Sequence, residues 1–374
     1  MPNADKPNTH EKDLNRRGFI QAVAATALAG GLAAARAQGE EEPAPKAQPA
    51  KAGRMKVGCQ RWGSDPKRLG FLLRYGVEGI CISPARSGPD GVWTEQTCRA
   101  AKKAVEDAGL LPVSMYWGVP QDVLIPERRD APIARCKQQI VVAGKAGIPC
   151  LAYTLHVRVW RARTGSTPGR GGASYSVWDL EKAERQQGKR DIGPLSADEH
   201  WARVTHFLQQ VDPVATEARV RLACHPDDPP MPQDNPWKIA QVLDSVEGLK
   251  RFVSTAESPF HGLTFCQGCV WEMLREKDKE GLYEAIRWFG SRKKIFQVHF
   301  RNLRGGPKKF AETFPDDGEM DMFRAVRTYK EVGYDGVLMP DHVPGHPEDA
   351  TDSPHFAFAY GYIKGLIDAA YSAV

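Results

Sequence analysis

Four residues with metal-binding side chains each stand at the end of a short apolar run, and this repeated arrangement limits the folds open to the chain. They are His225, Cys266, His299 and Asp341, which lie 41, 33 and 42 residues apart. Each separation is about the length of one strand, one helix and their connections. We therefore expect the four side chains at the ends of four successive parallel strands. That arrangement is typical of a barrel whose active site gathers at the carboxyl ends of its strands.

The rest of the chain supplies the elements that such a barrel needs. Apolar runs alternate with amphipathic stretches whose apolar residues recur every three or four positions, as strands alternate with helices. The predicted strands cover residues 56–62, 79–83, 111–117, 148–155, 220–225, 263–266, 295–300 and 336–341. The predicted helices cover residues 66–75, 94–109, 132–147, 196–217, 235–253, 277–289, 320–332 and 356–373. Eight strands close a (β/α)8 TIM barrel, an α/β fold, and we assign residues 55–374 to it.

The longest connection follows the fourth predicted strand and runs from residue 156 to residue 193. Its centre, residues 164–172, is too rich in glycine to be helical. Insertions of this size at the carboxyl end of a strand are commonly lids or substrate-binding loops. We therefore predict a long lid insertion after strand 4. A second polar loop, residues 305–318, is predicted after the seventh strand.

The first 37 residues have the pattern of a twin-arginine export signal. Arg16 and Arg17 precede an alanine-rich apolar run, and small residues at the end of that run predict cleavage after Ala37. The alternative is an amphipathic N-terminal helix, since the run is too short to span a bilayer. The signal predicts a periplasmic or otherwise exported protein that is free of the membrane after cleavage. Residues 38–54, rich in Glu, Pro, Ala and Lys, are predicted to be a disordered linker.

The net charge and the cysteines argue against a nucleic-acid-binding protein, a disulfide-rich protein and a structural zinc site. A net charge of +5 on 374 residues, without an arginine-rich helix, gives no reason to expect a nucleic-acid partner. Eight cysteines would suit disulfides in an oxidising compartment, but several lie in apolar runs where a small buried hydrophobe is expected. Cys266 and Cys269 have the CxxC spacing, yet the chain lacks the second CxxC that a structural zinc site would need.

The four strand-end residues offer two imidazoles, one thiolate and one carboxylate. Taken singly, a histidine at a strand end is more often a surface or core residue, and a buried cysteine is more often structural. At four successive strand ends they predict a single metal site. The mixture of nitrogen, sulfur and oxygen donors favours a borderline divalent ion, manganese, zinc, iron or cobalt, over calcium.

Several segments around these residues resemble the signature segments of the metal-dependent D-mannonate dehydratases. They are residues 225–230, 265–268, 298–302, 316–322 and 340–342, with weaker similarity at residues 145–149, 153, 160–164 and 361–366. The resemblance implies a xylose-isomerase-like TIM barrel that dehydrates D-mannonate to 2-keto-3-deoxy-D-gluconate (2-dehydro-3-deoxy-D-gluconate) on a manganese-type ion. It also implies that His225, Cys266, His299 and Asp341 hold the metal, and that His342 is a catalytic acid or base.

Five residues are predicted to contact the sugar-acid substrate. Arg301 is the candidate clamp for its carboxylate, and so a catalytic residue, because a guanidinium pairs bidentately with a carboxylate; the alternative is a salt bridge at the barrel rim. Asp228 is predicted to position substrate hydroxyls or metal ligands, with a loop turn as the alternative. Asn302 lies in the same segment as Arg301. The last two predicted substrate contacts are Trp62 and Arg161. Core packing is the alternative role for Trp62, and Arg161 lies on the predicted lid.

The chain departs from the family pattern in two places. The family usually has a tyrosine beyond the aspartate–histidine pair, whereas residues 343–355 contain His346 and His355 and no tyrosine. Residues 154–156, after Tyr153, lack the family's asparagine–phenylalanine pair. Either another residue takes the place of the tyrosine or the substrate differs.

Two other functions stay open at this point. An exported isomerase or epimerase of the xylose-isomerase type would use the same metal, although that class favours ligand sets richer in carboxylates. A sugar-acid binding protein without catalytic activity would keep the barrel and the ligands. A homo-oligomer is possible but not required, because one chain supplies the whole predicted barrel.

Overall fold

The computed structural model describes residues 53–60, 65–86, 88, 92–157, 162–185, 193–274 and 278–372. These residues all belong to one compact unit, residues 45–374. The predicted export signal and most of the predicted linker lie outside the described residues, as do Trp62 and Arg161. Within the described part of the chain, no helix combines the length and the apolar character needed to cross a membrane.

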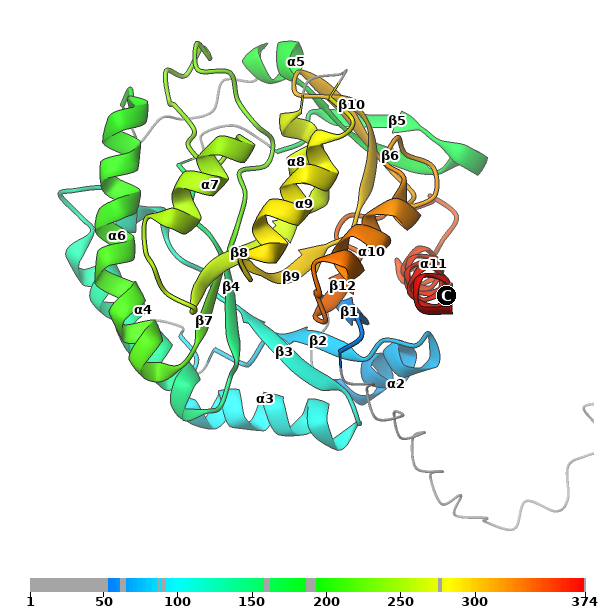
Figure 1. The fold of residues 1–374 in the computed structure, drawn as a ribbon, viewed down its shortest axis with the longest axis horizontal. Coiled ribbons are helices and arrows are strands. Elements are labelled where there is room, and N and C mark those ends of the chain that lie inside the picture. Colours follow the sequence, from blue (N-terminus) through cyan, green and yellow to red (C-terminus); the bar gives the residue numbers. More distant parts are fainter. Residues whose placement is uncertain are drawn as a thin grey trace, which may run out of the picture. The chain divides into compact units, whose positions relative to one another are not determined.

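Eight parallel strands form a closed barrel, as the eight apolar runs predicted (Figure 1). Around the barrel they are β1 (Lys56–Cys59), β2 (Gly79–Ile82), β3 (Leu111–Tyr116), β4 (Cys150–Thr154), β7 (Arg221–His225), β8 (His261–Cys266), β9 (Ile295–His299) and β12 (Val337–Met339). Strand β12 pairs with β1 and closes the ring. Most strand residues are buried, because helices cover the outer face of the barrel and side chains fill its interior.

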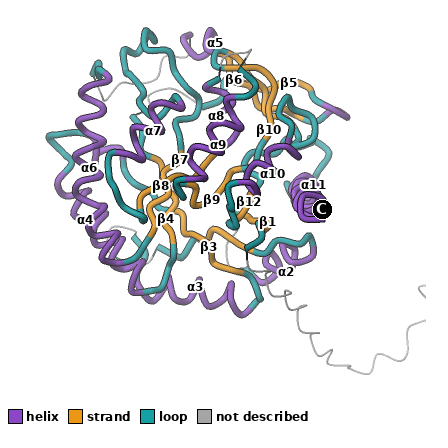
Figure 2. Tube along the Cα trace, viewed as in Figure 1, coloured by secondary structure: helices purple, strands orange, loops and turns teal. Residues whose placement is uncertain are grey.

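Helices surround the strands (Figure 2). They are α2 (Pro66–Arg74), α3 (Glu95–Asp107), α4 (Asp130–Lys145), α6 (Ala197–Ala218), α7 (Val246–Ser254), α9 (Gly281–Ser291), α10 (Met322–Glu331) and α11 (Ser353–Ser372), with shorter helices η2 (Gln121–Leu124), α5 (Leu180–Arg185) and α8 (Gln267–Met273) between them. Side-chain caps fix several starts: Asp65, Ser196 and Asp321 each accept a hydrogen bond from the backbone N–H three residues on.

One predicted helix start is wrong. The sequence pattern placed a helix over residues 235–253, but α7 begins only at Val246. The side-chain amide of Asn235 instead makes two local hydrogen bonds with the backbone. Its Nδ2 donates to the carbonyl oxygens of Pro232 (2.8 Å) and Ile239 (2.9 Å). Such local bonds compete with helix formation, and Ser245 then caps the real helix.

The predicted lid insertion and the predicted polar loop meet in one sheet. Strands β5 (Gly165–Pro168) and β6 (Ser174–Asp179) come from the insertion after β4, and β10 (Asn302–Gly306) and β11 (Lys309–Thr313) follow β9. They form a four-stranded antiparallel sheet in the order β10-β11-β6-β5. The prediction of a loop over residues 305–318 is therefore wrong for β11. A lid function for the insertion remains a prediction.

Gly305 makes the tight β10–β11 hairpin possible. Its φ of +97° lies in the left-handed region, and a Cβ at this position would come within 2.3 Å of the carbonyl oxygen of Lys309. Only glycine meets both conditions. In the hairpin Gly305 pairs with Phe310, and on its other side β11 places Phe310 opposite Trp178 of β6.

Candidate active site

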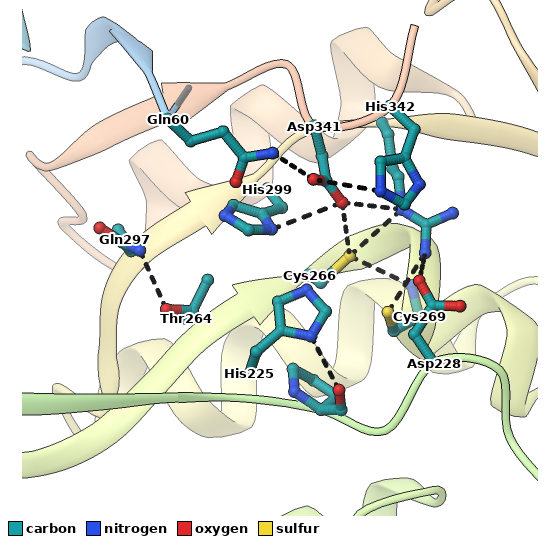
Figure 3. Close-up of polar contacts among 12 residues, drawn as sticks. Gln60, His225, Asp228, Thr264, Cys266, Cys269, Gln297, His299, Asp341 and His342 are labelled. Atoms are coloured by element: carbon teal, nitrogen blue, oxygen red, sulfur yellow. Dashed lines mark hydrogen bonds and ion pairs between the residues drawn. The ribbon is translucent and has the colours of Figure 1, made fainter. Parts of the chain in front are cut away.

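The four predicted metal ligands converge at the carboxyl end of the barrel (Figure 3). His225, Cys266 and His299 are the last residues of β7, β8 and β9, and Asp341 lies two residues beyond β12. The parallel register pairs Cys266 directly with His299. One candidate ligand atom from each of the four residues lies within 4.8 Å of the other three.

The hydrogen bonds around these side chains leave metal-binding atoms available. Nδ1 of His225 lies 2.7 Å from the carbonyl oxygen of Pro226, so Nδ1 is the donor and the lone pair is on Nε2. Gln60 donates to Oδ1 of Asp341. Nδ1 of His299 is buried, lies 3.5 Å from Oδ2 of Asp341, and has no hydrogen-bond partner among the described residues.

A buried ring nitrogen without a partner is costly, and a bound cation would remove that cost. The donors also suit such an ion, because imidazole and thiolate favour borderline divalent metals and the carboxylate adds negative charge. The four residues therefore fit a divalent metal ion.

The electrostatics of the site agree with this donor set. Burial alone would raise the pKa of the Cys266 thiol, but its bond with Cys269, the charge of Arg301 and the two neighbouring histidines hold the pKa well below the usual value. Cys266 is thus a thiolate, the form that binds metals. Burial would lower the pKa of His225, yet contact with this thiolate and with Asp341 raises it to about 9. The excess of negative charge attracts a cation or, in its place, protons.

Arg301 does not present a free face to a substrate. Its side chain is 1% exposed, and its nitrogens face other groups of the protein. Nη1 lies 3.0 Å from Glu312, Nη2 lies 2.8 Å from both Asp228 and Glu272, and Nε lies 3.4 Å from the sulfur of Cys266. Only one N–H, on Nη1, lies outside these contacts, so Arg301 lacks the pair of donors that the predicted bidentate clamp on a substrate carboxylate would need. Arg301 instead neutralises buried acidic groups behind the ligands.

The glycine of the Cys266-Gln267-Gly268 segment allows this close packing. A Cβ at Gly268 would lie 2.7 Å from both Cγ and Nε of Arg301. The arginine is enclosed on all sides and has little room to move away. The segment thus combines a metal-binding thiolate with a backbone that Arg301 can approach closely.

Asn302 and Asp228 also have roles inside the protein. Nδ2 of Asn302 donates to the carbonyl oxygens of Pro315 (2.9 Å) and Met320 (3.2 Å), and its Oδ1 accepts from two backbone N–H groups, so the predicted substrate contact is replaced by the support of a turn. Asp228 joins two arginines: Nη1 and Nη2 of Arg163 bond its two oxygens at 2.7 and 3.1 Å, and Arg301 bonds it from the other side.

Arg163 and Glu312 enter the site from the second sheet. Arg163 lies two residues before β5, and Glu312 lies on β11 with a side chain 5% exposed. Arg163 donates to Glu312, and its guanidinium lies over the ring of Phe310, 4.9 Å from the centroid. Glu312 was missed because its stretch was assigned to a loop. The alternation of Phe310 and Glu312 on one face of a short strand was the signal for it.

His342, the predicted acid or base, lies between the ligands and a cavity. Its Nδ1 is 2.5 Å from Oε1 of Glu312, and its Nε2 is 3.7 Å from Oδ1 of Asp341. Burial would lower the pKa of His342, but Asp341 and Glu312 outweigh it and raise the pKa above the usual value. The cavity beside the ring has a volume of about 360 Å³ and is also lined by Arg163 and Glu312. Cavities of this size bind small molecules.

Comparison with known proteins identifies the family. A family model described as D-mannonate dehydratase (UxuA) matches residues 177–373, more than half of the chain and including all four converging residues. The chain belongs to the D-mannonate dehydratase family. It is therefore a member of a family of hydro-lyases. Mannonate dehydratase 2 of Halalkalibacterium halodurans is 28% identical over 316 residues, which cover 75% of this chain and 89% of that protein. The mannonate dehydratase of Thermotoga maritima is 29% identical over 307 residues, 71% of this chain and 82% of the relative.

Solved structures agree with the fold. The mannonate dehydratase from Streptococcus suis serotype 2 superposes with a TM-score of 0.72 at 26% identity, covering 85% of this chain and 95% of that one. A xylose isomerase domain protein from Planctomyces limnophilus superposes with a TM-score of 0.56 at 14% identity, covering 86% and 99% of the two chains. The second likeness shows the fold alone. Together they confirm the predicted TIM barrel.

Proposed function

We propose that this member of the D-mannonate dehydratase family converts D-mannonate to 2-dehydro-3-deoxy-D-gluconate and water in a metal-dependent reaction. One observation carries the proposal. In a barrel of this family, two imidazoles, a thiolate and a carboxylate lie at successive strand ends with their ligand atoms within 4.8 Å of one another. The relatives named above bear the name of this activity.

His225, Cys266, His299 and Asp341 would hold the metal, and we propose Mn²⁺, with Fe²⁺, Co²⁺ and Zn²⁺ as the alternatives to test. When bound, the divalent ion supplies positive charge that offsets the negative charge developing on the substrate carboxylate as the neighbouring C2–H bond breaks. The arginines at the site leave the compensation of this charge to the ion. Arg163 and Arg301 each already face two or more acidic side chains, so little of their charge remains for a substrate carboxylate.

The chain's own residues position and transfer protons. Glu312 accepts the bond from Nδ1 of His342 and fixes the orientation of that ring beside the cavity. Held in this way, the His342 ring is placed to give a proton to the leaving C3 hydroxyl. Arg163 and Arg301 are positioning residues, since they hold Glu312 and Asp228 in place.

The test is a discontinuous assay of the full chain, reconstituted with Mn²⁺ and supplied with D-mannonate, in which the 2-keto-3-deoxy acid is measured. Product should form, and it should disappear with a chelator. The Cys266→Ala variant should lose both bound metal and activity. Cys150→Ala is the matched control, because Cys150 is equally buried on β4 but lies outside the ligand group.

Two results would contradict the proposal. One is stoichiometric metal with no product from D-mannonate. The other is conversion of keto-sugars, and not of aldonates, by the same preparation, which would favour an isomerase.

A further inference from the structure

The cavity beside His342 is also lined by a second histidine that the proposed function has not used. His355 lies in the first turn of α11 and is 8% exposed. Its Nδ1 is 3.2 Å from Oδ2 of Asp349. The lining of the cavity includes His342, His355, Arg163, Glu312, Asp352 and Gly345. Two carboxylate–imidazole pairs, Glu312–His342 and Asp349–His355, therefore meet at one cavity.

The two rings differ in what their second nitrogen faces. Nε2 of His342 is directed toward the metal-ligand candidate Asp341, at 3.7 Å. Nε2 of His355 makes no hydrogen bond to any residue that the structure describes and is not sealed from solvent. Gly345 lies in front of it: a Cβ added there would come to 3.6 Å from Nε2. The absence of a side chain at Gly345 keeps the space next to this nitrogen open.

The carboxylate of Asp349 orients the His355 ring and selects its tautomer. A carboxylate next to Nδ1 favours the tautomer with the proton on Nδ1 and the lone pair on Nε2. A neutral imidazole held in this way, with its lone pair toward a substrate cavity, is the arrangement of a general base oriented by an acidic residue. The charged and titratable groups that share the cavity with His355 are Arg163, Glu312, His342 and Asp352, with Asp349 behind the ring.

We propose that His355 is the general base of the dehydration, an inference that rests on the proposed function. Its Nε2 takes the proton from C2 of the substrate. The electron pair of the C2–H bond becomes the C2=C3 bond as the C3–O bond breaks, and His342 gives its proton to the departing hydroxyl, which leaves as water. The enol then gains a proton at C3 and loses one from its C2 hydroxyl, which gives the 2-keto acid. Proton exchange with water returns His355 to its neutral form and His342 to its protonated form.

The experiment compares His355→Ala with wild type in the full, Mn²⁺-loaded chain. We expect kcat to fall by about 10²- to 10⁴-fold, the usual contribution of a general base, with KM changed far less. Added imidazole should restore activity, and the restored rate should follow the concentration of neutral imidazole as the pH passes through 7. The matched control is His346→Ala, in the same loop but outside the cavity lining, which should keep wild-type kcat.

A second variant guards against misfolding of the first. Asp349 is a third exposed, so Asp349→Asn should fold, and it should lower kcat by about tenfold because the ring loses its orientation. Wild-type kcat in both His355→Ala and Asp349→Asn would overturn the inference. So would a His355→Ala protein with wild-type metal content and melting temperature whose lost activity imidazole does not restore, or a rescue that follows imidazolium. Absence of turnover in the wild-type chain would instead refute the proposed function, so the two failures are distinguishable.

Discussion

Replacement of Arg301 separates its structural role from a role in substrate binding. The side chain is 1% exposed and faces Glu272 (0% exposed), Glu312 (5%) and Asp228 (12%). Removing one partner of a buried ion pair costs about 3–5 kcal/mol, because the remaining charge stays buried without compensation. Arg163 still pairs with Asp228 and Glu312 after the change, and burial already raises the pKa of Glu272 well above its usual value. The groups left without a nearby cation are Asp341, 3.3 Å from Nε, and the sulfur of Cys266, 3.4 Å from Nε. We therefore expect Arg301→Met to lower the free energy of unfolding by about 3 kcal/mol, the low end of that range.

The assay is chemical denaturation of the chain with chelator present, so that metal loss does not contribute to the difference. Adding Glu272→Gln to Arg301→Met should change the free energy of unfolding little further, because burial raises the pKa of Glu272 well above its usual value and keeps the carboxyl group neutral once Arg301 is gone. Arg304→Met is the matched control: Arg304 is 54% exposed and pairs with Asp317 at the surface, so we expect less than about 1 kcal/mol. Unchanged stability of Arg301→Met, together with a raised KM for the substrate, would refute the reasoning. It would favour the original prediction that Arg301 binds the substrate carboxylate.

Four further predictions concern metal, packing, pH and export. Mn²⁺ added to the metal-free chain should raise its melting temperature by scanning calorimetry, and the increase should vanish in His299→Ala; an increase of equal size in that variant would exclude His299 as a ligand. Gly268→Ala should lower metal affinity in a competition titration, because its Cβ would lie 2.7 Å from Arg301 and displace the arginine from the thiolate; wild-type affinity would contradict the close packing. Burial lowers the pKa of His261 to about 4, so its contribution to stability is present above pH 6.5 and declines as the pH falls toward 4. Between pH 6.5 and 5 the free energy of unfolding of wild type should fall by about 1.6 kcal/mol more than that of His261→Gln, and an equal fall in the two proteins, measured by urea denaturation at each pH, would contradict this. If residues 1–37 form the export signal, Arg16→Lys with Arg17→Lys should retain the protein in the cytoplasm on cell fractionation, and unchanged distribution would contradict export by that route.

The barrel and the convergence of its ligands were predictable because both depend on local patterns. A parallel strand buried on both faces is a short apolar run, and the residue that ends it necessarily lies at the carboxyl rim of the barrel. His225, Cys266 and His299 are all such terminal residues. Their meeting within 4.8 Å follows from the closure of the strands, which the spacing of the runs indicated.

The surroundings of the ligands were not predictable, because they depend on pairings between distant segments. Glu312 reaches the site only because β11 pairs with β6, more than a hundred residues earlier in the chain. The orientation of Arg301 depends in turn on Glu312 and on Glu272 of α8, both of which sequence patterns had left without a role. A guanidinium suited to a substrate carboxylate is equally suited to a buried glutamate, and only the fold decides between them. The same holds for Asn302, whose amide satisfies a turn.

The most direct test of the central claim is turnover of D-mannonate by the full chain as a function of bound Mn²⁺, with the product identified by NMR. The account predicts 2-dehydro-3-deoxy-D-gluconate in amounts that rise with metal occupancy, saturate at one ion per chain, and fall to background in Cys266→Ala. A chain that binds one ion through these residues and forms no such product, or that forms it equally well after complete removal of metal, would contradict the account.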